Sequence, residues 1–363
     1  MNFWKTLPKP IIGLSPMDGV TDAPTRQIAQ HIAPPDVSVT EFVNVEGLAR
    51  GATKMLDDFI YLENETPIIA QIYGIEVDSF YKVTIIACFL GFSGVDINMG
   101  CPAKKVALRG AGSGLIQHPQ HAQEIIKSTR QAIDDFTNGT TLEEANIRPK
   151  IITAIKGMYK KYSHMKTRCE NNRAQKTYIP LSIKTRTGFD EENVETWITS
   201  ILSAKDSHNK DIRIDAIILH GRTMKQKYLG LANWEAIKRA SHIIKKISPE
   251  TIILGNGDIT SQEQANKYSE KFNTDGVLIG RATFGNPWIF NKNENNIEIT
   301  EQMRKNAAIK HCEFFEQILP HRQFFIMRKH LAWYMKEFPG SRELRGKLMH
   351  ANSAEEVKEI FNS

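Results

Sequence analysis

Short apolar, β-branched runs alternate with longer amphipathic segments along most of the chain. Eight runs have the length and composition of buried strands, at residues 10–16, 37–43, 67–73, 94–98, 179–186, 214–220, 251–255 and 275–279. Helical periodicity lies between several of them, at residues 77–90, 119–136, 192–204, 234–247 and 261–272. Asp22 is placed to cap a further helix, with Pro24 in its first turn. The pattern predicts repeated strand–helix units.

Eight parallel strands in about 285 residues are what a closed (β/α)₈ TIM barrel needs. A doubly wound open sheet is the alternative, but no Gly-x-Gly-x-x-Gly sequence follows the first strand. We therefore predict an α/β fold with the barrel over residues 1–295. After about residue 300 the strand pattern stops, and helical segments at residues 303–318, 322–336 and 354–361 predict a small all-α domain over residues 300–363.

Composition places the chain among ordinary globular proteins, with 41% hydrophobic and 24% charged residues in 363. The longest apolar run, residues 83–92, is too short to span a membrane, and the N-terminus lacks a basic-then-apolar leader. The cysteines Cys88, Cys101, Cys169 and Cys312 form no Cys-x-x-Cys pair. We expect a cytoplasmic protein with reduced thiols, no metal centre and no membrane association, acting as a monomer.

The net charge of +6 is unevenly distributed. Between residues 145 and 178, nine lysines and arginines accompany a single acid, and from residue 300 onward eleven accompany eight, which leaves the remainder mildly acidic. The segment at residues 137–178 is also too long for one barrel connection, so we interpret it as an insertion. The simpler interpretation is a solvated surface insertion, and the alternative is an additional arm that binds a polyanion.

Glycine and polar residues gather where the predicted strands end, which is where barrel enzymes place their active sites. Gly255, Gly257 and Gly280 would allow the backbone to approach a phosphate closely, and Arg281 adds a charged donor. The glycines at 255 and 257 alone, or Gly280 with Arg281 alone, would indicate only an ordinary turn. Because they lie on adjacent predicted strands, the two together favour a cofactor phosphate site.

Lys184 lies on the same face of the fifth predicted strand as Ser182 and Arg186. It could be a rim lysine, a Schiff-base lysine of an aldolase, or a cation that stabilises a reduced flavin. His220 could hydrogen-bond the same ring or cap its own strand. The residues alone leave these alternatives open.

Cys101 lies between Gly100 and Pro102 at a strand end, and we expect a tight, exposed turn with a working thiol. No histidine is near it in sequence to generate a thiolate, so a protonated thiol acting as a general acid is the chemistry it favours. Neither His-x-His nor His-Glu-x-x-His occurs, which disfavours a catalytic metal.

Six motifs then occur in an order that resembles the tRNA-dihydrouridine synthases, most closely the bacterial branch. They are Pro16-Met17-Asp18-Gly19-Val20-Thr21-Asp22, Asn98-Met99-Gly100-Cys101-Pro102 with Lys105-Val106, Gly112-Ser113-Gly114-Leu115, Lys184-x-Arg186-x-Gly188, His220-Gly221-Arg222-Thr223 and Asn256-Gly257-Asp258-Ile259. The cysteine turn with its trailing lysine and valine is the most specific of them. Asp18 departs from the family, which commonly has a small residue there.

The resemblance implies an FMN enzyme that uses NADPH to reduce the C5=C6 bond of particular uridines in tRNA. It implies that Cys101 donates the proton, and that Asn98, Lys105, Arg186 and Arg222 contact the substrate. The residues it implies for FMN are Pro16, Met17, Asp18, Gln71, Lys184, His220, Asn256, Gly257, Asp258, Gly280 and Arg281.

The helical tail would then grip the tRNA backbone through basic side chains. These are Arg322, Arg328, Lys329, Arg342, Arg345 and Lys347. Two other classes remain as alternatives: an FMN barrel reductase of a free small molecule, and an RNA-binding protein with a non-catalytic barrel. The basic tail disfavours the first, and the intact set of Cys101, Lys184 and His220 disfavours the second.

Overall fold

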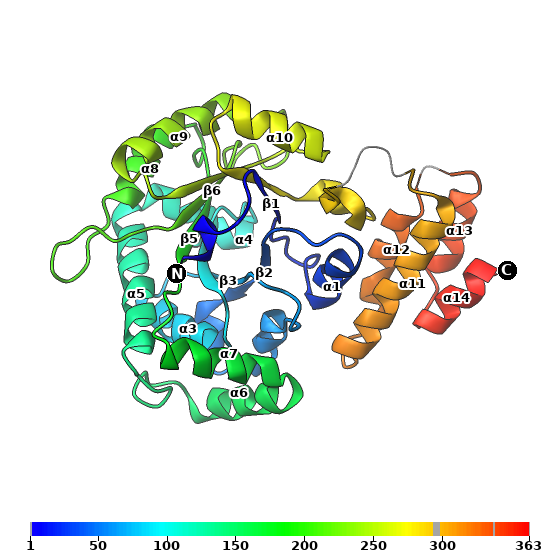
Figure 1. The fold of residues 1–363 in the computed structure, drawn as a ribbon, viewed down its shortest axis with the longest axis horizontal. Helices are drawn as coiled ribbons and strands as arrows, with labels where there is room; N and C mark the ends of the chain where they lie inside the picture. The colour runs from blue at the N-terminus through cyan, green and yellow to red at the C-terminus, as the bar shows by residue number, and fades with distance from the viewer. Residues whose placement is uncertain (1, 293–297, 337, 363) are drawn as a thin grey trace.

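The computed structural model describes residues 2–292, 298–336 and 338–362. Eight parallel strands close into a barrel in chain order, with β1 pairing to both β2 and β8 (Figure 1). This confirms the predicted TIM barrel. The strands are β1 (Ile11–Leu14), β2 (Ser38–Asn44), β3 (Ile68–Tyr73), β4 (Gly94–Met99), β5 (Leu181–Arg186), β6 (Ala216–His220), β7 (Ile252–Asn256) and β8 (Gly276–Ile279).

Helices follow the strands and surround the barrel (Figure 1). Asp22 caps the first of them as predicted, its side chain accepting a hydrogen bond from the Thr25 N–H at 3.0 Å. The helices of the barrel repeat are α1 (Ala23–Ile32), α2 (Val45–Ala49), α3 (Val77–Phe89), α4 (Lys104–Ala107), α5 (Pro119–Thr137), α8 (Val194–Leu202), α9 (Trp234–Ile247) and α10 (Gln262–Lys271).

The barrel interior is apolar at one end and polar at the other. At the N-terminal end, Ile11, Val39, Ile69 and Leu254 fill the interior, and Trp4 packs against them. Nearer the C-terminal ends, the inward positions of β3, β4, β5 and β6 carry polar groups, namely Gln71, Asp96, Asn98, Lys184 and His220. The apolar layer therefore supports a polar layer above it, and that layer forms the floor of the site.

The segment predicted as an insertion folds into two helices, α6 (Pro149–Lys161) and α7 (Ser163–Ala174), between α5 and β5. Ile151, Ile152 and Ile155 are buried on one face of α6, and Met165 and Cys169 on one face of α7. These faces belong to the same apolar core as α3 and α5. The insertion is therefore packed onto the barrel rather than projecting from it.

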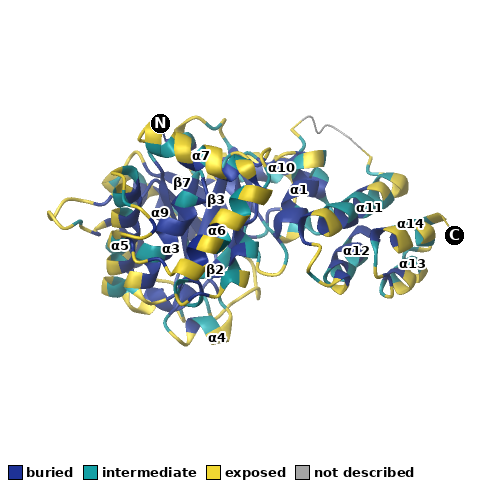
Figure 2. Cartoon of the chain, turned by 90° about the horizontal axis from the view of Figure 1, so that it is seen from below, coloured by how far each residue is buried: buried dark blue, intermediate teal, exposed yellow. Residues whose placement is uncertain are grey.

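The chain ends in a helical lobe beside the barrel, made of α11 (Glu301–Ile318), α12 (Arg328–Tyr334), α13 (Ser341–Leu348) and α14 (Ala354–Asn362) (Figure 2). α11 packs along α1. The helix predicted over residues 322–336 is shorter, because Phe324–Met327 forms a 3₁₀ turn before α12. The pattern missed α13, in which Leu348 is the one fully buried side chain. The predicted boundary at residue 295 lies outside the described residues.

Candidate active site

A cavity of about 900 Å³ opens at the C-terminal ends of the strands. Its wall comes from the segments that follow β1, β4, β5, β6, β7 and β8, so residues far apart in sequence converge there. The predicted site residues that line it are Pro16, Met17, Asp18, Asn98, Cys101, Lys184, Arg186, His220, Asn256, Gly257, Asp258, Gly280 and Arg281.

A chain of hydrogen bonds runs beneath the cavity to the cysteine turn. Gln71 Nε2 donates to Asp96 Oδ2 at 2.7 Å, and Gln71 Oε1 accepts from Asn98 Nδ2 at 2.9 Å. Asn98 Oδ1 accepts the backbone N–H groups of Gly100 and Cys101 at 3.0 and 2.9 Å. Because a carboxylate only accepts, Asp96 fixes which end of the Gln71 amide faces Asn98. The hydrogen bonds from Asp96 through Gln71 to Asn98 therefore fix the orientation of the turn at Gly100 and Cys101.

Cys101 is buried, with 9% of its surface exposed, although Ala103 in the same turn is exposed, so the turn reaches the surface as expected but the cysteine itself does not. The Gly112–Gln117 turn packs against the cysteine: the Ser113 hydroxyl donates to the Cys101 carbonyl at 2.7 Å, and a Cβ on Gly112 would lie 3.0 Å from the Cys101 Cβ. Burial raises the pKa of the thiol, although Arg186 and Lys184 oppose the shift. The cysteine therefore faces the cavity as a protonated thiol at neutral pH.

Two cations border the thiol. Arg186 Nε donates to the Gly100 carbonyl at 2.7 Å, and its Nη1 donates to the Thr223 carbonyl at 3.0 Å, so it holds the cysteine turn against the loop after β6. Lys184 Nζ donates to Asn256 Oδ1 at 3.2 Å. Burial, and then the charge of Arg186, lowers the pKa of Lys184 to about 8, while Asp96 opposes the shift. The wall is positively charged at neutral pH.

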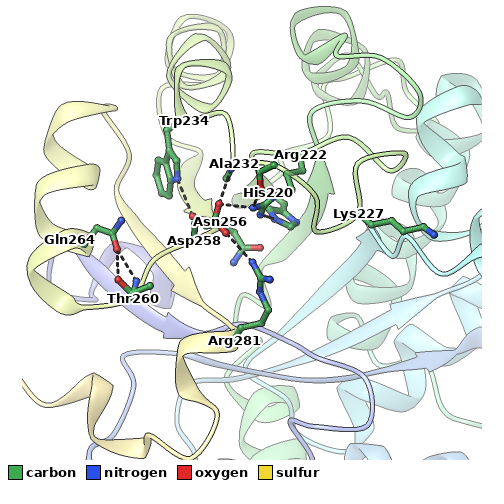
Figure 3. A network of polar contacts seen from close by, with 12 residues as sticks. His220, Arg222, Lys227, Ala232, Trp234, Asn256, Asp258, Thr260, Gln264 and Arg281 are labelled. Atoms are coloured by element: carbon green, nitrogen blue, oxygen red, sulfur yellow. Dashed lines mark hydrogen bonds and ion pairs between the residues drawn. The ribbon is translucent and has the colours of Figure 1, made fainter. Parts of the chain in front are cut away.

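Asp258 organises the opposite wall (Figure 3). Its carboxylate accepts from Arg222 Nη2 at 2.6 Å, from Arg281 Nη2 at 2.9 Å and from the Ala232 N–H at 2.8 Å. Burial alone would raise the pKa of Asp258, but these contacts hold it below its ordinary value. Arg222 Nη1 also lies 3.2 Å from His220 Nε2.

Arginine only donates hydrogen bonds, so the His220 Nε2 accepts from Arg222 and its Nδ1 carries the proton. Burial and the surrounding cations, first Arg186 and Lys184, lower the pKa of His220 well below its usual value. His220 is therefore a neutral ring with a fixed tautomer, and its position beside Asn256 is visible in Figure 3.

The glycines of the last two strands have different surroundings. A Cβ on Gly257, which has φ of +125°, would lie 3.0 Å from the His220 ring, whereas one on Gly280 would meet nothing closer than Met17 Sδ at 3.5 Å. Gly255 does not belong to this site, because a Cβ there would lie 2.3 Å from the Trp234 ring. Its small size serves the packing of α9, which corrects the expectation that it approaches a phosphate.

Three predicted site residues lie outside the cavity wall. Gln71 is in the layer below, Arg222 is buried behind His220 with its donors on Asp258 and the Gly230 carbonyl, and Lys105 is exposed on α4 next to Lys104, which does line the wall. The sequence interpretation also missed Asp96, whose signal is its alternation with Asn98 on β4. Further lining residues that it missed include Phe42, Lys104, Lys227, Tyr228 and Phe284.

The helical lobe meets the barrel beside this cavity through charged contacts. Arg322 Nη2 lies 2.8 Å from Asp58 Oδ1, His321 Nε2 lies 2.7 Å from Asp57 Oδ2, and Lys329 donates to the Gly19 carbonyl. Arg328 donates within the lobe, to the Ala351 carbonyl and to Asn352. Of the six basic side chains expected to grip RNA, Arg322, Arg328 and Lys329 are therefore engaged by the protein itself, and Lys347 pairs with Glu343 within α13.

The described part of the chain contains no group of three or more His, Cys, Asp or Glu side chains arranged to hold a metal ion. Among the same residues, no helix has the length and apolar character needed to cross a membrane.

Comparison with known proteins identifies a family that accounts for the motifs. The dihydrouridine synthase family model matches residues 13–142 and 160–362. A protein named "Probable tRNA-dihydrouridine synthase" from Staphylococcus aureus (strain COL) is 30% identical over 99% of this chain and 95% of its own length. "Probable tRNA-dihydrouridine synthase 2" from Bacillus subtilis (strain 168) is 30% identical over 99% and 96%.

Solved structures match at lower similarity. Histamine dehydrogenase from Rhizobium sp. 4-9 is 12% identical with a TM-score of 0.41, over 84% of this chain and 49% of that one. Morphinone reductase is 10% identical with a TM-score of 0.37, over 82% and 89%.

Proposed function

Because the chain belongs to the dihydrouridine synthase family, we propose that it reduces the C5=C6 bond of uridines in tRNA to give 5,6-dihydrouridine. The observation that carries this proposal is the buried, protonated Cys101 thiol beside the cations Arg186 and Lys184 in the wall of one cavity. The reaction adds a hydride and a proton to the double bond, so it needs an acid on one side of the base. The arrangement fits a free-standing thiol acid better than a thiolate nucleophile, which would need a lowered pKa.

The residues of the wall fit a flavin mononucleotide. Gly280 has open space where a side chain would be, next to Met17, and Arg281 lines the same cavity, which suits a phosphate. Lys184 and the neutral His220 provide donors at the other end, where the ring would lie. Lys184, with its ammonium held by Asn256, would stabilise negative charge on that ring. A bound reduced flavin would supply the hydride, and we propose NADPH as its source of electrons.

Cys101 completes the reduction from this chain's own side. Its S–H bond breaks as a C–H bond forms at C5 of the uracil, and the thiolate that results lies near Arg186 and Lys184, which stabilise it until solvent returns the proton. Asn98 and Arg186 line the same part of the cavity and would orient the uracil edge. Gln71 and Arg222 lie behind the wall: Gln71 positions Asn98, and Arg222 positions His220 and Asp258.

A uridine reaches such a cavity only after it leaves its base stack, so the enzyme must also hold the RNA backbone. The remaining members of the expected lobe set lie on α13, where Arg342 and Lys347 are exposed and Arg345 is half-buried, and Lys347 pairs within the helix with Glu343. We propose that these residues contact tRNA phosphates, and that the protein works in the cytoplasm as a monomer.

The test is to map dihydrouridine in tRNA from cells with and without this protein, and to repeat the reaction with purified protein, FMN and NADPH. The proposal expects specific positions to lose dihydrouridine and to regain it in vitro. Unchanged tRNA would contradict it. Reduction of free uracil at a comparable rate without RNA would favour a small-molecule reductase instead.

A further inference from the structure

The inserted helix α6 presents a basic face to solvent. Its apolar side, Ile151, Ile152 and Ile155, is buried against the barrel helices, while Lys150, Lys156 and Lys160 are exposed on the other side. Figure 2 shows the exposed side of this helix on the flank of the barrel. Because the buried side is anchored, the lysines project from a fixed surface rather than from a flexible loop.

No acid accompanies the charges on this face, whereas three other surface helices pair their lysines with acids. On α3, α7 and α11, lysines pair with acids one turn away, as Lys82 does with Asp78, Lys166 with Glu170 and Lys305 with Glu301. Lys150, Lys156 and Lys160 have no ion pair with any residue the structure describes, and α6 contains no acid.

Lys156 and Lys160 are one turn apart, where like charges destabilise a helix. A helix whose role was only to cover the barrel would gain stability from an acid at one of these positions. Single-sign charge on a packed helix is therefore the pattern of a surface that meets a polyanion.

The position of α6 connects it to both parts that the proposed function uses. It begins near the connection that leaves β2, where a Cβ on Gly51 would lie 3.6 Å from the Arg148 side chain. At its other end, the Lys161 ammonium and the Tyr162 hydroxyl donate to the Ile318 carbonyl at 3.3 and 3.4 Å, at the end of α11. The helix thus bridges the barrel and the helical lobe along one side.

We propose that the exposed face of α6, formed by Arg148, Lys150, Lys156 and Lys160, binds the phosphodiester backbone of the RNA whose uridine enters the cavity. This inference rests on the proposed function. The family model passes over residues 143–159, which hold Arg148, Lys150 and Lys156 of this face. The α6 face has cations available for phosphates, whereas Arg322, Arg328 and Lys329 of the lobe already bind groups of the protein.

The test compares three holoenzyme variants with the unaltered protein, using an unmodified tRNA transcript as the probe. One carries Lys150→Gln, Lys156→Gln and Lys160→Gln. A matched control carries Lys238→Gln, Lys246→Gln and Lys267→Gln on α9 and α10, which Figure 1 shows on the opposite side of the barrel. A third replaces the α6 lysines with arginine and keeps the charge.

We expect the α6 glutamine variant to bind the transcript roughly tenfold more weakly at physiological salt, with its slope of log affinity against log salt reduced by about 2 to 3. Its KM for tRNA should rise while kcat stays within twofold. The arginine variant and the α9/α10 control should keep the original slope and affinity. Equal slopes for the α6 variant and the unaltered protein, or equal losses in the two glutamine variants, would overturn the proposal.

Binding and turnover are measured separately, so this inference can fail independently of the proposed function. Dihydrouridine formation with unchanged salt slopes would remove α6 from the interface and leave the activity intact. If the α6 glutamine variant has a lowered salt slope but the unaltered protein forms no dihydrouridine, α6 binds RNA and the proposed reaction is wrong.

Discussion

The cavity and the interface between barrel and lobe both take charged groups out of water, but they compensate the charge differently. In the cavity, Lys184 and Arg186 hydrogen-bond to Asn256, Gly100 and Thr223, all of which belong to the barrel. At the interface, the barrel contributes carboxylates, Asp18, Glu41 and Asp58, while the opposing cations Arg322 and Lys329 come from the lobe.

The difference shows which part of the site can form without the helical lobe. The cavity wall is held by neighbouring strands, so its geometry depends on barrel closure. The interface carboxylates repel one another, and burial together with Asp22, Asp58 and Asp18 raises the pKa of Glu41 to about 8. The barrel surface next to Asp18 therefore depends on the lobe for charge balance, and Asp18 also lines the cavity.

Cys101→Ala tests the cavity side most directly and should have the largest effect. Removing the acid should lower dihydrouridine formation by about 10²–10⁴-fold. Bound flavin should be retained, because Cys101 follows β4, which lies across the closed barrel from β8, the strand that precedes Gly280 and Arg281. Single-turnover reduction of tRNA measures the rate, and flavin absorbance measures retention. Full activity of the variant would exclude the acid role.

Asp96→Asn tests whether the cavity is organised from below. The variant can reverse the Gln71 amide and so loosen the Asn98 contact with the Cys101 turn, and we expect kcat to fall by roughly 10–100-fold with KM little changed.

Burial raises the pKa of Asp96 to about 6, so kcat of the unaltered enzyme should also fall as the pH drops below 6 and this carboxylate gains its proton. That acid limb should disappear in Asp96→Asn. Ser182→Ala, which removes only a 2.7 Å donor to Asp96, is the matched control and should retain the limb. An acid limb that survives in Asp96→Asn would assign it to another group.

Two buried histidines make the lobe interface sensitive to acid. Burial lowers the pKa values of His311 and His330 to about 3, and the two rings are 4.9 Å apart. Both are neutral in the folded protein and protonate near 6.5 when unfolded, so stability should be lost as the pH falls from 6.5 toward 3. At pH 5 the loss should be about 2 kcal/mol per histidine.

His330→Phe isolates one of these groups, because its Nε2 has no hydrogen-bond partner among the described residues and phenylalanine keeps an aromatic ring there. The difference in unfolding free energy between pH 7 and pH 5, measured with urea, should fall by about half. His242→Gln on the exposed side of α9 should leave that difference unchanged. Equal pH dependence in His330→Phe and the unaltered protein would contradict the assignment.

Arg322→Ala should have the smallest effect, about 1 kcal/mol, since the Arg322–Asp58 pair keeps about a quarter of each side chain exposed. The loss comes from leaving Asp58 among other carboxylates. Combining the change with Asp58→Asn should restore part of the stability in a urea titration. A double variant less stable than the single one would show that the pair is not the cause.

Strand and helix periodicity was enough to predict the barrel, and the strand-end motifs predicted most of the cavity wall. Contacts between distant segments were not predictable in the same way. The burial of Cys101 depends on the Gly112 turn, the place of Arg222 depends on Asp258, and Gly255 is small because of Trp234. The basic residues of the lobe could be counted, but their partners at Asp58 and Gly19 exist only after the lobe docks.

Barrel closure also determines when the chain can finish folding during its synthesis. β1 obtains its second neighbour only when β8 is available, and α1 packs on α11, which follows still later in the chain. A nascent chain that has not yet extended past residue 318 therefore leaves an open strand edge on β1 or an uncovered face on α1, together with carboxylates that lack their cations. The native state is thus reached after translation of the lobe, and a ribosome-bound intermediate must be protected from aggregation until then.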